Sequence, residues 1–522
     1  MRITEFFDRG LRQNPDGAAY VMDGRRWTYR ESYALSCRVA HGLTAALRPG
    51  AKVAVLSPNH PEAWICVLAT WRAGMVWVPL NPAVPAAETA DLAASLGCEA
   101  ILYHSSLGEV VELLRDRVPE LRLAVCLDRT DDDRTDDRTP WLHDWCGDLP
   151  SEPPAVDTAF EDIVAIPPTG GTTGLPKGVL NNHRGITTST ALLMMLLDYE
   201  AHQPIVNLAA APMTHTSGFL SLPATARGGT VVVLDKADPA VLADVVEEHG
   251  VTEMFLPPTV IYRWLDHLRG QQRDFSSLRY LIYGSAPMSV DRLREAIGVF
   301  GPVMTSAYGQ TEAPGTIALM RCAELFDADG TLNEARLSAC GRPSPLLSVE
   351  LRDDDDRPVP RGAEGEICVR GDTVMVGYHE LPDRTAETVV GGWLHTGDVG
   401  RLDDDGYLHI TDRKKDMIIS GGFNVFPSEV EQVLWRHPAV GDCAVVGAPH
   451  PDWGEQVTAV VELRAGASAT PEELVAWCRG RLGGVRTPKR IDIVDELPRS
   501  HNGKVLRNRV RETYWQGAGR RI

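Results

Sequence analysis

The sequence predicts an α/β protein with a large N-terminal α/β domain of several subdomains, residues 1–412, and a small α+β domain, residues 413–522. The chain has 522 residues, which is more than a single hydrophobic core usually holds. Helical and strand patterns alternate along its N-terminal part, as they do in α/β domains. A charged segment at 411–416 then leads into a glycine pair, and we place the domain boundary there.

The elements of the large domain have recognisable signals. Thr28 and Glu31 have the spacing of a capping box, which predicts a helix that runs through Leu43. Apolar runs predict strands at 53–56, 76–80, 163–166, 251–256, 278–283 and 365–371, and a helix at 61–71. Residues 403–406 predict a hairpin turn.

The small domain shows the same kinds of signal. Ser428 and Glu431 predict a second capping box, and Thr470 with Glu473 predicts a third, here with Pro471 at the first helical position. Strands are expected at 444–446 and 457–461. A hairpin is expected around the glycine pair at 421–422.

Composition limits the classes of function. The formal charge of −19 argues against nucleic acid or an anionic membrane surface as the main partner. The ten cysteines form no Cys-x-x-Cys pair, which predicts reduced, mostly buried thiols and neither a disulfide framework nor a metal cluster. The N-terminal residues lack the apolar stretch of a signal peptide, and the apolar run at 191–197 is too short to span a membrane. We therefore expect a cytoplasmic protein without a membrane span.

The segment Thr169–Gly178 combines glycines, threonines and Lys177 directly after a predicted buried strand. Glycines let backbone N–H groups turn toward a ligand, hydroxyls donate hydrogen bonds, and an ammonium offsets negative charge, so this loop is suited to phosphates. It differs from a Walker A loop, because Pro176 precedes the lysine and a strand follows. The alternative interpretation is an ordinary turn rich in glycine and threonine.

A second motif is Tyr308-Gly309-Gln310-Thr311-Glu312. An aromatic ring can stack on a purine, glycine admits a close ligand, and a carboxylate beside a hydroxyl can hold Mg²⁺ against phosphates. On its own, such a string is as often a surface turn. Lysine is scarce in this chain, so the lysines inside motifs, at 177, 414, 415 and 504, are candidates for specific roles.

These motifs resemble those of the adenylate-forming superfamily, which includes acyl-CoA synthetases, firefly-luciferase-like enzymes and nonribosomal-peptide adenylation domains; acyl-CoA synthetases are the most similar. The resemblance implies a nucleotide site in which Asp398 accepts hydrogen bonds from the ribose and Arg413 contacts the ribose or phosphate. The implied ATP-binding residues are Thr169, Gly170, Gly171, Thr172, Thr173, Gly174, Lys177, Gly284, Ser285, Ala286, Tyr308, Gly309, Gln310, Thr311, Asp398, Arg413 and Lys504.

The resemblance also implies catalytic roles and a mobile small domain. Catalysis would use Lys504, Lys177, Thr311 and Glu312, the last as the Mg²⁺ ligand, and the small domain would turn about a hinge at Lys415. The implied residues of the acyl pocket are His215, Phe219, Ala286 and Gly309, and those of the pantetheine tunnel are Gly421 and Gly422. No acidic residue lies between Met213 and Leu222, which argues against an amino acid substrate.

The activity implied by the resemblance is ATP-dependent activation of a hydrophobic carboxylic acid as an acyl-adenylate, followed by transfer to the thiol of CoA. An acyl-AMP ligase that passes the acyl group to a carrier protein or a partner enzyme is the main alternative. A luciferase-like oxygenase and a non-catalytic adenylate-binding protein are further ones. ATP, Mg²⁺ and CoA are the expected cofactors and co-substrates, and a homodimer is the default assembly.

Overall fold

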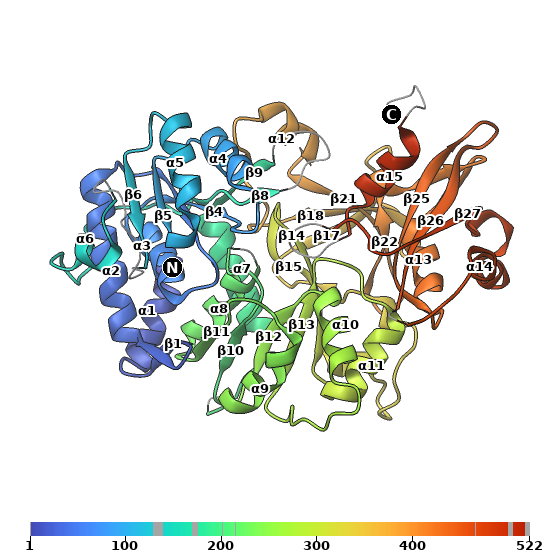
Figure 1. Ribbon diagram of the computed structural model, residues 1–522, viewed down its shortest axis with the longest axis horizontal. Helices are drawn as coiled ribbons and strands as arrows, with labels where there is room; N and C mark the ends of the chain where they lie inside the picture. The colour runs from blue at the N-terminus through green and yellow to red at the C-terminus, as the bar shows by residue number, and fades with distance from the viewer. Residues whose placement is uncertain are drawn as a thin grey trace.

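The computed structural model describes residues 2–128, 139–169, 176–200, 202–214, 216–464, 466–499 and 505–516. Within these ranges the strands form four sheets, two large and two small. Figure 1 shows the N-terminal elements in blue on one side and the C-terminal elements in orange and red on the other. The predicted α/β class is confirmed.

The first large sheet contains the strand that follows the predicted phosphate loop. Its order is β19 (Gly377–Tyr378), β9 (Lys177–Asn182), β7 (Ile163–Ala165), β4 (Val76–Leu80), β3 (Lys52–Leu56), β5 (Ala100–Tyr103) and β6 (Leu123–Cys126), with β8 (Pro168–Thr169) paired to β9. The strands from β7 to β6 are parallel, whereas β9 runs antiparallel to both β7 and β19. The late strand β19 therefore joins a sheet built from the first part of the chain.

The second large sheet carries the Tyr308 motif. Its order is β16 (Arg342–Pro343), β15 (Ala313–Met320), β14 (Met304–Gln310), β13 (Tyr280–Gly284), β12 (Glu253–Leu256), β10 (Val206–Ala209), β11 (Thr230–Val233), β1 (Ala18–Met22) and β2 (Arg25–Thr28). The strands from β14 to β1 are parallel. Their carboxyl ends therefore share one edge, where ligands bind in open α/β sheets.

Helices pack between and outside these two sheets. The helices of the large part are α1 (Thr4–Gln13), α2 (Tyr29–Ala46), α3 (Pro61–Arg72), α4 (Ala86–Ser95), α5 (Gly108–Arg117), α6 (Leu142–Cys146), α7 (His183–Leu196), α8 (Thr216–Ala226), α9 (Pro239–His249), α10 (Pro258–His267), α11 (Val290–Phe300) and α12 (Pro382–Thr388). One core joins α1, α2, α3 and α8 to strands of both large sheets, while α4 and α5 cover the outer face of one sheet and α9, α10 and α11 that of the other. The two large sheets are therefore packed against a shared core, which fixes their positions relative to each other.

The two small sheets flank the predicted domain boundary. The first has the order β17 (Ser348–Arg352), β18 (Glu364–Arg370), β21 (Trp393–Leu402) and β20 (Val389–Val390), with β22 (Leu408–Arg413) paired to β21. The second has the order β24 (Phe423–Val425), β23 (Ile418–Ser420), β26 (Gly454–Leu463) and β25 (Val440–His450), with β27 (Arg490–Val494) paired to β26. Helices α13 (Pro427–Trp435), α14 (Pro471–Arg486) and α15 (Arg507–Trp515) pack on this last sheet, which forms the unit at the red end of Figure 1.

The structure confirms two of the three predicted capping boxes. The pairs at Thr28 and Thr470 are both present. The box predicted at Ser428 is wrong, because α13 begins after Phe426 with no side-chain cap. Tertiary partners take both side chains: the Ser428 hydroxyl donates to the carbonyl of Thr411, and Glu431 pairs with Arg507. Tertiary contacts therefore override this local signal.

All ten cysteines are free thiols, and nine of them are buried, as the sequence predicts. In the described part of the chain, no helix has both the length and the apolar character needed to cross a membrane.

Candidate active site

The predicted phosphate loop connects two paired strands. Thr169 at the end of β8 lies opposite Lys177 at the start of β9, and Pro168 lies opposite Gly178. The returning strand predicted after the loop is therefore present. The loop residues between these strands that were predicted to bind ATP, Gly170, Gly171, Thr172, Thr173 and Gly174, lie outside the described residues.

Thr311 and Glu312 occupy the two-residue connection between β14 and β15, because Gln310 pairs with Ala313 across the hairpin. The carbonyl oxygen of Glu312 accepts a hydrogen bond of 2.8 Å from the backbone N–H of Met375, which fixes the connection against the segment that leads to β19.

Tyr378 joins these two motifs, and the sequence analysis missed it. Its hydroxyl donates a 2.8 Å hydrogen bond to Oε1 of Glu312, and the Nζ atom of Lys177 lies 4.3 Å from the centre of its ring. Burial raises the pKa of the Tyr378 phenol, and the adjacent Glu312 carboxylate raises it further. The phenol therefore stays protonated and remains a donor. No sequence spacing indicates this contact, because it depends on the pairing of β19 with β9.

Asp398 is held by one residue from each of two other strands. The Tyr308 hydroxyl donates to Oδ2 of Asp398 at 2.8 Å, and Nε of Arg413 lies 3.3 Å from Oδ1. Asp398 and Arg413 are register partners in β21 and β22, which explains their approach. Burial raises the pKa of the Tyr308 phenol, and the Asp398 charge adds to the effect. The structure thus brings three of the predicted nucleotide-binding residues into contact.

The segment Gly284 to Ala286 follows the carboxyl end of β13, next to β14. Gly284 pairs with Ala307, and a Cβ atom at Gly284 would lie 2.4 Å from the Ala307 carbonyl oxygen, so only glycine fits. Ser285 has a φ of +68°, a left-handed conformation that is uncommon for residues other than glycine. Similarly, a Cβ at Gly309 would lie 2.3 Å from the carbonyl oxygen of Gly315.

Of the predicted acyl-pocket residues, His215 lies outside the described residues. Phe219 is partly buried on α8, and its ring packs edge-on against Trp64, with centroids 6.4 Å apart, and tilted against Trp77 at 5.7 Å. Phe219 therefore joins an aromatic cluster of the core. Ala286 and Gly309 lie on the sheet edge described above.

Lys415 links this edge to the small domain. It lies in the short helical turn Lys414–Asp416 that follows β22. Partial burial lowers the pKa of its ammonium, the nearby cations Arg413 and Lys177 also lower it, and Asp416 and Asp398 oppose them. In this arrangement of the chain, Lys415 therefore shares the surroundings of Asp398 and Lys177.

Polar contacts connect the two sides of the predicted boundary. The Asp412 carboxylate accepts a 2.7 Å hydrogen bond from the backbone N–H of Ser428 and lies 3.1 Å from Nη1 of Arg507. Arg507 also pairs with Glu431, and the side chains of Asp412 and Glu431 are each only 2% exposed. The sequence analysis did not single out this cluster.

The remaining predicted residues lie in the small domain. Gly421 and Gly422 form the turn between β23 and β24 with φ values of +58° and +83°, which explains the need for glycine. The backbone N–H of Gly421 donates to the carbonyl of Trp453 at 3.0 Å. Lys504 lies outside the described residues. On either side of that gap, Arg499 and Val505 form an antiparallel bridge.

The donor set fits a magnesium ion held chiefly by phosphates. In the described part of the chain, no group of three or more His, Cys, Asp or Glu side chains could hold a metal. Mg²⁺ is commonly bound by one or two carboxylates together with substrate phosphates, and the carboxylate of Glu312, next to Thr311 in the chain, would suit that role.

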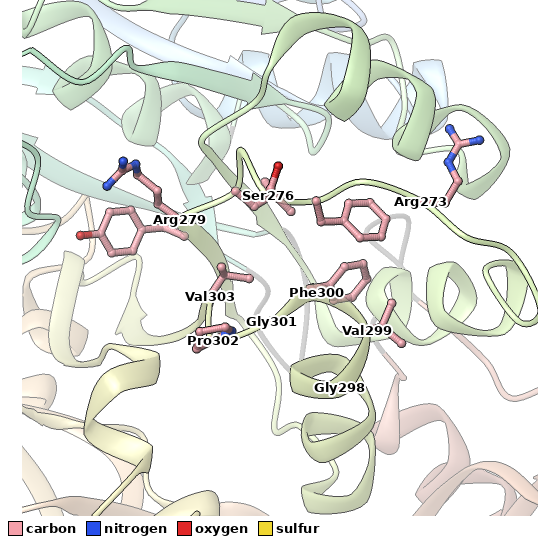
Figure 2. A pocket seen from close by; sticks show the side chains of 12 residues that line it. Arg273, Ser276, Arg279, Gly298, Val299, Phe300, Gly301, Pro302 and Val303 are labelled. Carbon is pink, nitrogen blue, oxygen red and sulfur yellow. The ribbon is translucent and has the colours of Figure 1, made fainter. Parts of the chain in front are cut away.

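A hollow of about 670 Å³ lies on the second large sheet, the one that carries the Tyr308 motif (Figure 2). Its lining includes Arg279 and Tyr280 at the start of β13 and Val303 just before β14. It therefore lies at the amino ends of these strands, whereas the motif residues lie at their carboxyl ends. Since ligands of α/β sheets bind at the carboxyl ends, we do not assign the active site to this hollow.

Family models match this chain in two places: the AMP-binding enzyme model over residues 7–379 and the AMP-binding enzyme C-terminal domain model over residues 429–504. The chain belongs to the AMP-binding enzyme family. The resemblance to adenylate-forming enzymes is thus confirmed.

Curated members of the AMP-binding enzyme family align over most of the chain. The medium/long-chain-fatty-acid–CoA ligase FadD8 of Mycobacterium tuberculosis is 37% identical over 482 residues, covering 91% of this chain and 83% of the relative. The feruloyl-CoA synthase of an Amycolatopsis species is 36% identical over 514 residues, covering 97% of this chain and 98% of the relative. The fatty acid–[acyl-carrier-protein] ligase ScoC of Streptomyces coeruleorubidus is 33% identical over 512 residues, covering 97% of this chain and 95% of the relative.

Among solved structures, ATP-bound MatB from Rhodopseudomonas palustris has a TM-score of 0.87 and 29% identity, and the match covers 100% of both chains. The overall fold of this chain is therefore similar to that of ATP-bound MatB over its whole length.

Proposed function

We propose that this AMP-binding enzyme is an AMP-forming acid–CoA ligase that activates a hydrophobic carboxylic acid. The observation that carries the proposal is the approach of motif residues from three different sheets. Lys177 and Glu312 both contact Tyr378, whereas Tyr308 and Arg413 both contact Asp398. The charges of Lys177 and Asp398 both act on Lys415, which relates the two groups. Relatives named as CoA ligases support the same reaction.

The first step joins the acid to the nucleotide. A carboxylate oxygen attacks the α-phosphorus of ATP, the bond to the bridging oxygen breaks, and pyrophosphate leaves. Both reactants are anions, so cations must offset their repulsion and the charge of the transition state. Lys177 and the loop amides are assigned to the β- and γ-phosphates, and Lys504 to the carboxylate and the α-phosphate. No protein nucleophile is required, since positioning supplies much of the acceleration.

Asp398 and Tyr308 are assigned to the nucleoside. Two carboxylate oxygens suit the two adjacent ribose hydroxyls, and the Tyr308 hydroxyl, which donates to Oδ2, fixes the orientation of the carboxylate. Segment 284–286 and the Tyr308 ring flank the space for adenine. Mg²⁺, held by Glu312 and the phosphates, would neutralise phosphate charge.

The second step uses the small domain. The thiol sulfur of CoA forms a bond to the acyl carbon, the bond from that carbon to the AMP oxygen breaks, and the thiol proton is released. We assign Lys415 as the hinge, the turn Gly421–Gly422 to the pantetheine tunnel, and the division at residues 412 and 413 as the domain boundary. Rotation about this hinge would withdraw Lys504 after adenylation.

A second candidate acceptor is the thiol of a carrier protein. The relative ScoC, named as an acyl-carrier-protein ligase, favours it, but FadD8 and the feruloyl-CoA synthase, whose names specify CoA, are more similar to this chain. Adenylation itself is common to both alternatives. We further propose a cytoplasmic location and a homodimeric assembly, as expected from the sequence.

The test is to incubate the protein with MgATP and a panel of fatty and aromatic acids, then to add either CoA or an acyl-carrier protein. We expect AMP, pyrophosphate and an acyl-CoA, identified by mass spectrometry. Acyl transfer to the carrier protein without acyl-CoA would instead support the alternative. Release of AMP without any thioester would contradict both acceptors.

A further inference from the structure

Tyr378 lies between two opposite charges of the proposed ATP site. The Lys177 ammonium is 4.3 Å from the ring centre, the Glu312 carboxylate accepts from the hydroxyl at 2.8 Å, and the tyrosine is only 6% exposed. We propose that Tyr378 is a positioning residue that keeps Lys177 and Glu312 apart, so that the ammonium remains available to the phosphates of ATP. This inference rests on the proposed function.

The two charged groups have a strong tendency to pair. An ammonium and a carboxylate at contact distance attract each other, and the attraction increases as water is excluded. Direct pairing would neutralise the cation needed for polyphosphate and occupy the carboxylate needed for the metal. Yet no salt bridge links Lys177 to Glu312, although the structure describes both side chains. Something must therefore offer each group a competing partner.

The tyrosine side chain offers both partners at once. Its ring face attracts a cation through the aromatic quadrupole, and its hydroxyl donates a charge-assisted hydrogen bond to the carboxylate. Because the ring is rigid, the ammonium is held over its face and the carboxylate at its hydroxyl.

The backbone holds Tyr378 in register with both motifs. It pairs with Val179, two residues after Lys177, and its N–H donates to the Thr385 hydroxyl oxygen at 2.9 Å. Three residues earlier, the N–H of Met375 donates to the carbonyl of Glu312 at 2.8 Å. The same short segment is thus hydrogen-bonded to the strand of the lysine and to the turn of the carboxylate.

The experiment measures ATP binding by calorimetry with the full chain, without acid and with EDTA, so that neither turnover nor metal contributes. Tyr378→Phe keeps the ring face for Lys177 but removes the donor to Glu312, so its affinity for ATP should fall between those of wild type and Tyr378→Leu. Tyr378→Leu removes both partners, so Lys177 is captured by Glu312, and metal-free ATP should bind roughly tenfold more weakly or worse. The double variant Tyr378→Leu with Glu312→Gln removes the capturing charge and should recover the affinity of Glu312→Gln alone.

Recovery in the double variant distinguishes positioning from local disruption of the fold around Tyr378. If the leucine merely disrupted the fold, ATP binding would remain weak in the double variant as well. Tyr378→Met, which fills a similar volume, provides a second test if the leucine variant melts early. Tyr199→Phe is the matched control, because that hydroxyl donates to a buried carboxylate, Glu253, at 2.7 Å and should not affect ATP binding. Unchanged ATP binding in Tyr378→Leu, or no recovery in the double variant, would overturn the inference. Absence of ATP binding by the wild-type protein would instead contradict the proposed function.

Discussion

Asp398→Asn tests the proposed ribose site. One Asp398 oxygen accepts from Tyr308 at 2.8 Å, and the other faces Arg413 at 3.3 Å. In asparagine only one of these two positions remains an acceptor, so at least one charge-assisted hydrogen bond to a ribose hydroxyl is lost. Such a bond contributes about 1.5–3 kcal/mol, which corresponds to a weakening of ATP binding by roughly 10- to 100-fold.

The assay compares ATP with 2′,3′-dideoxy-ATP by calorimetry in the absence of acid. Wild type should prefer ATP by a similar factor, and Asp398→Asn should lose most of that preference. Asp492→Asn is the matched control, because this carboxylate also accepts from a tyrosine hydroxyl, that of Tyr514, and pairs with an arginine, Arg490. If the variant weakened both nucleotides equally, the ribose assignment would be refuted.

Three further predictions concern chemistry, stability and pH. Lys504→Ala should slow adenylate formation by roughly 100- to 1000-fold but leave thioester formation from supplied acyl-adenylate largely intact; equal loss in both half-reactions would exclude this role. Arg507→Ala should destabilise the small domain by about 3 kcal/mol, because it leaves the buried Glu431 carboxylate unpaired, and the urea midpoint should fall. Hydrogen bonding to Glu62 raises the pKa of His143, so this pair stabilises fully below the ordinary histidine pKa and less as pH rises through the raised value. His143 is largely exposed, so His143→Gln should remove only about 0.5–1 kcal/mol of stability at low pH and nothing at high pH; thermal melts that shift equally at all pH values would contradict this.

Local signals were sufficient for most elements and for the two motifs. The cap at Thr28 depends on residues three apart, and the loop before Lys177 on consecutive ones, so both can be recognised in one sequence. The assignment of Asp398 to a ribose site came from resemblance, and the structure adds its contacts with Tyr308 and Arg413.

Long-range pairing explains what the sequence analysis missed. Tyr378 reaches Glu312 only because β19, a strand of two residues, joins a sheet formed by the beginning of the chain. The Ser428 capping box failed for a related reason, since Arg507, far along the chain, pairs with the glutamate that would have completed it. Neither contact has a signal at short sequence separation.

The most direct test of the central claim is isotope exchange between labelled pyrophosphate and ATP in the presence of acid and without any thiol. Reversible adenylation predicts exchange that requires both the acid and Mg²⁺ and that nearly disappears in Lys504→Ala. Exchange that proceeds without any acid, or its absence with every fatty and aromatic acid tested, would contradict the account.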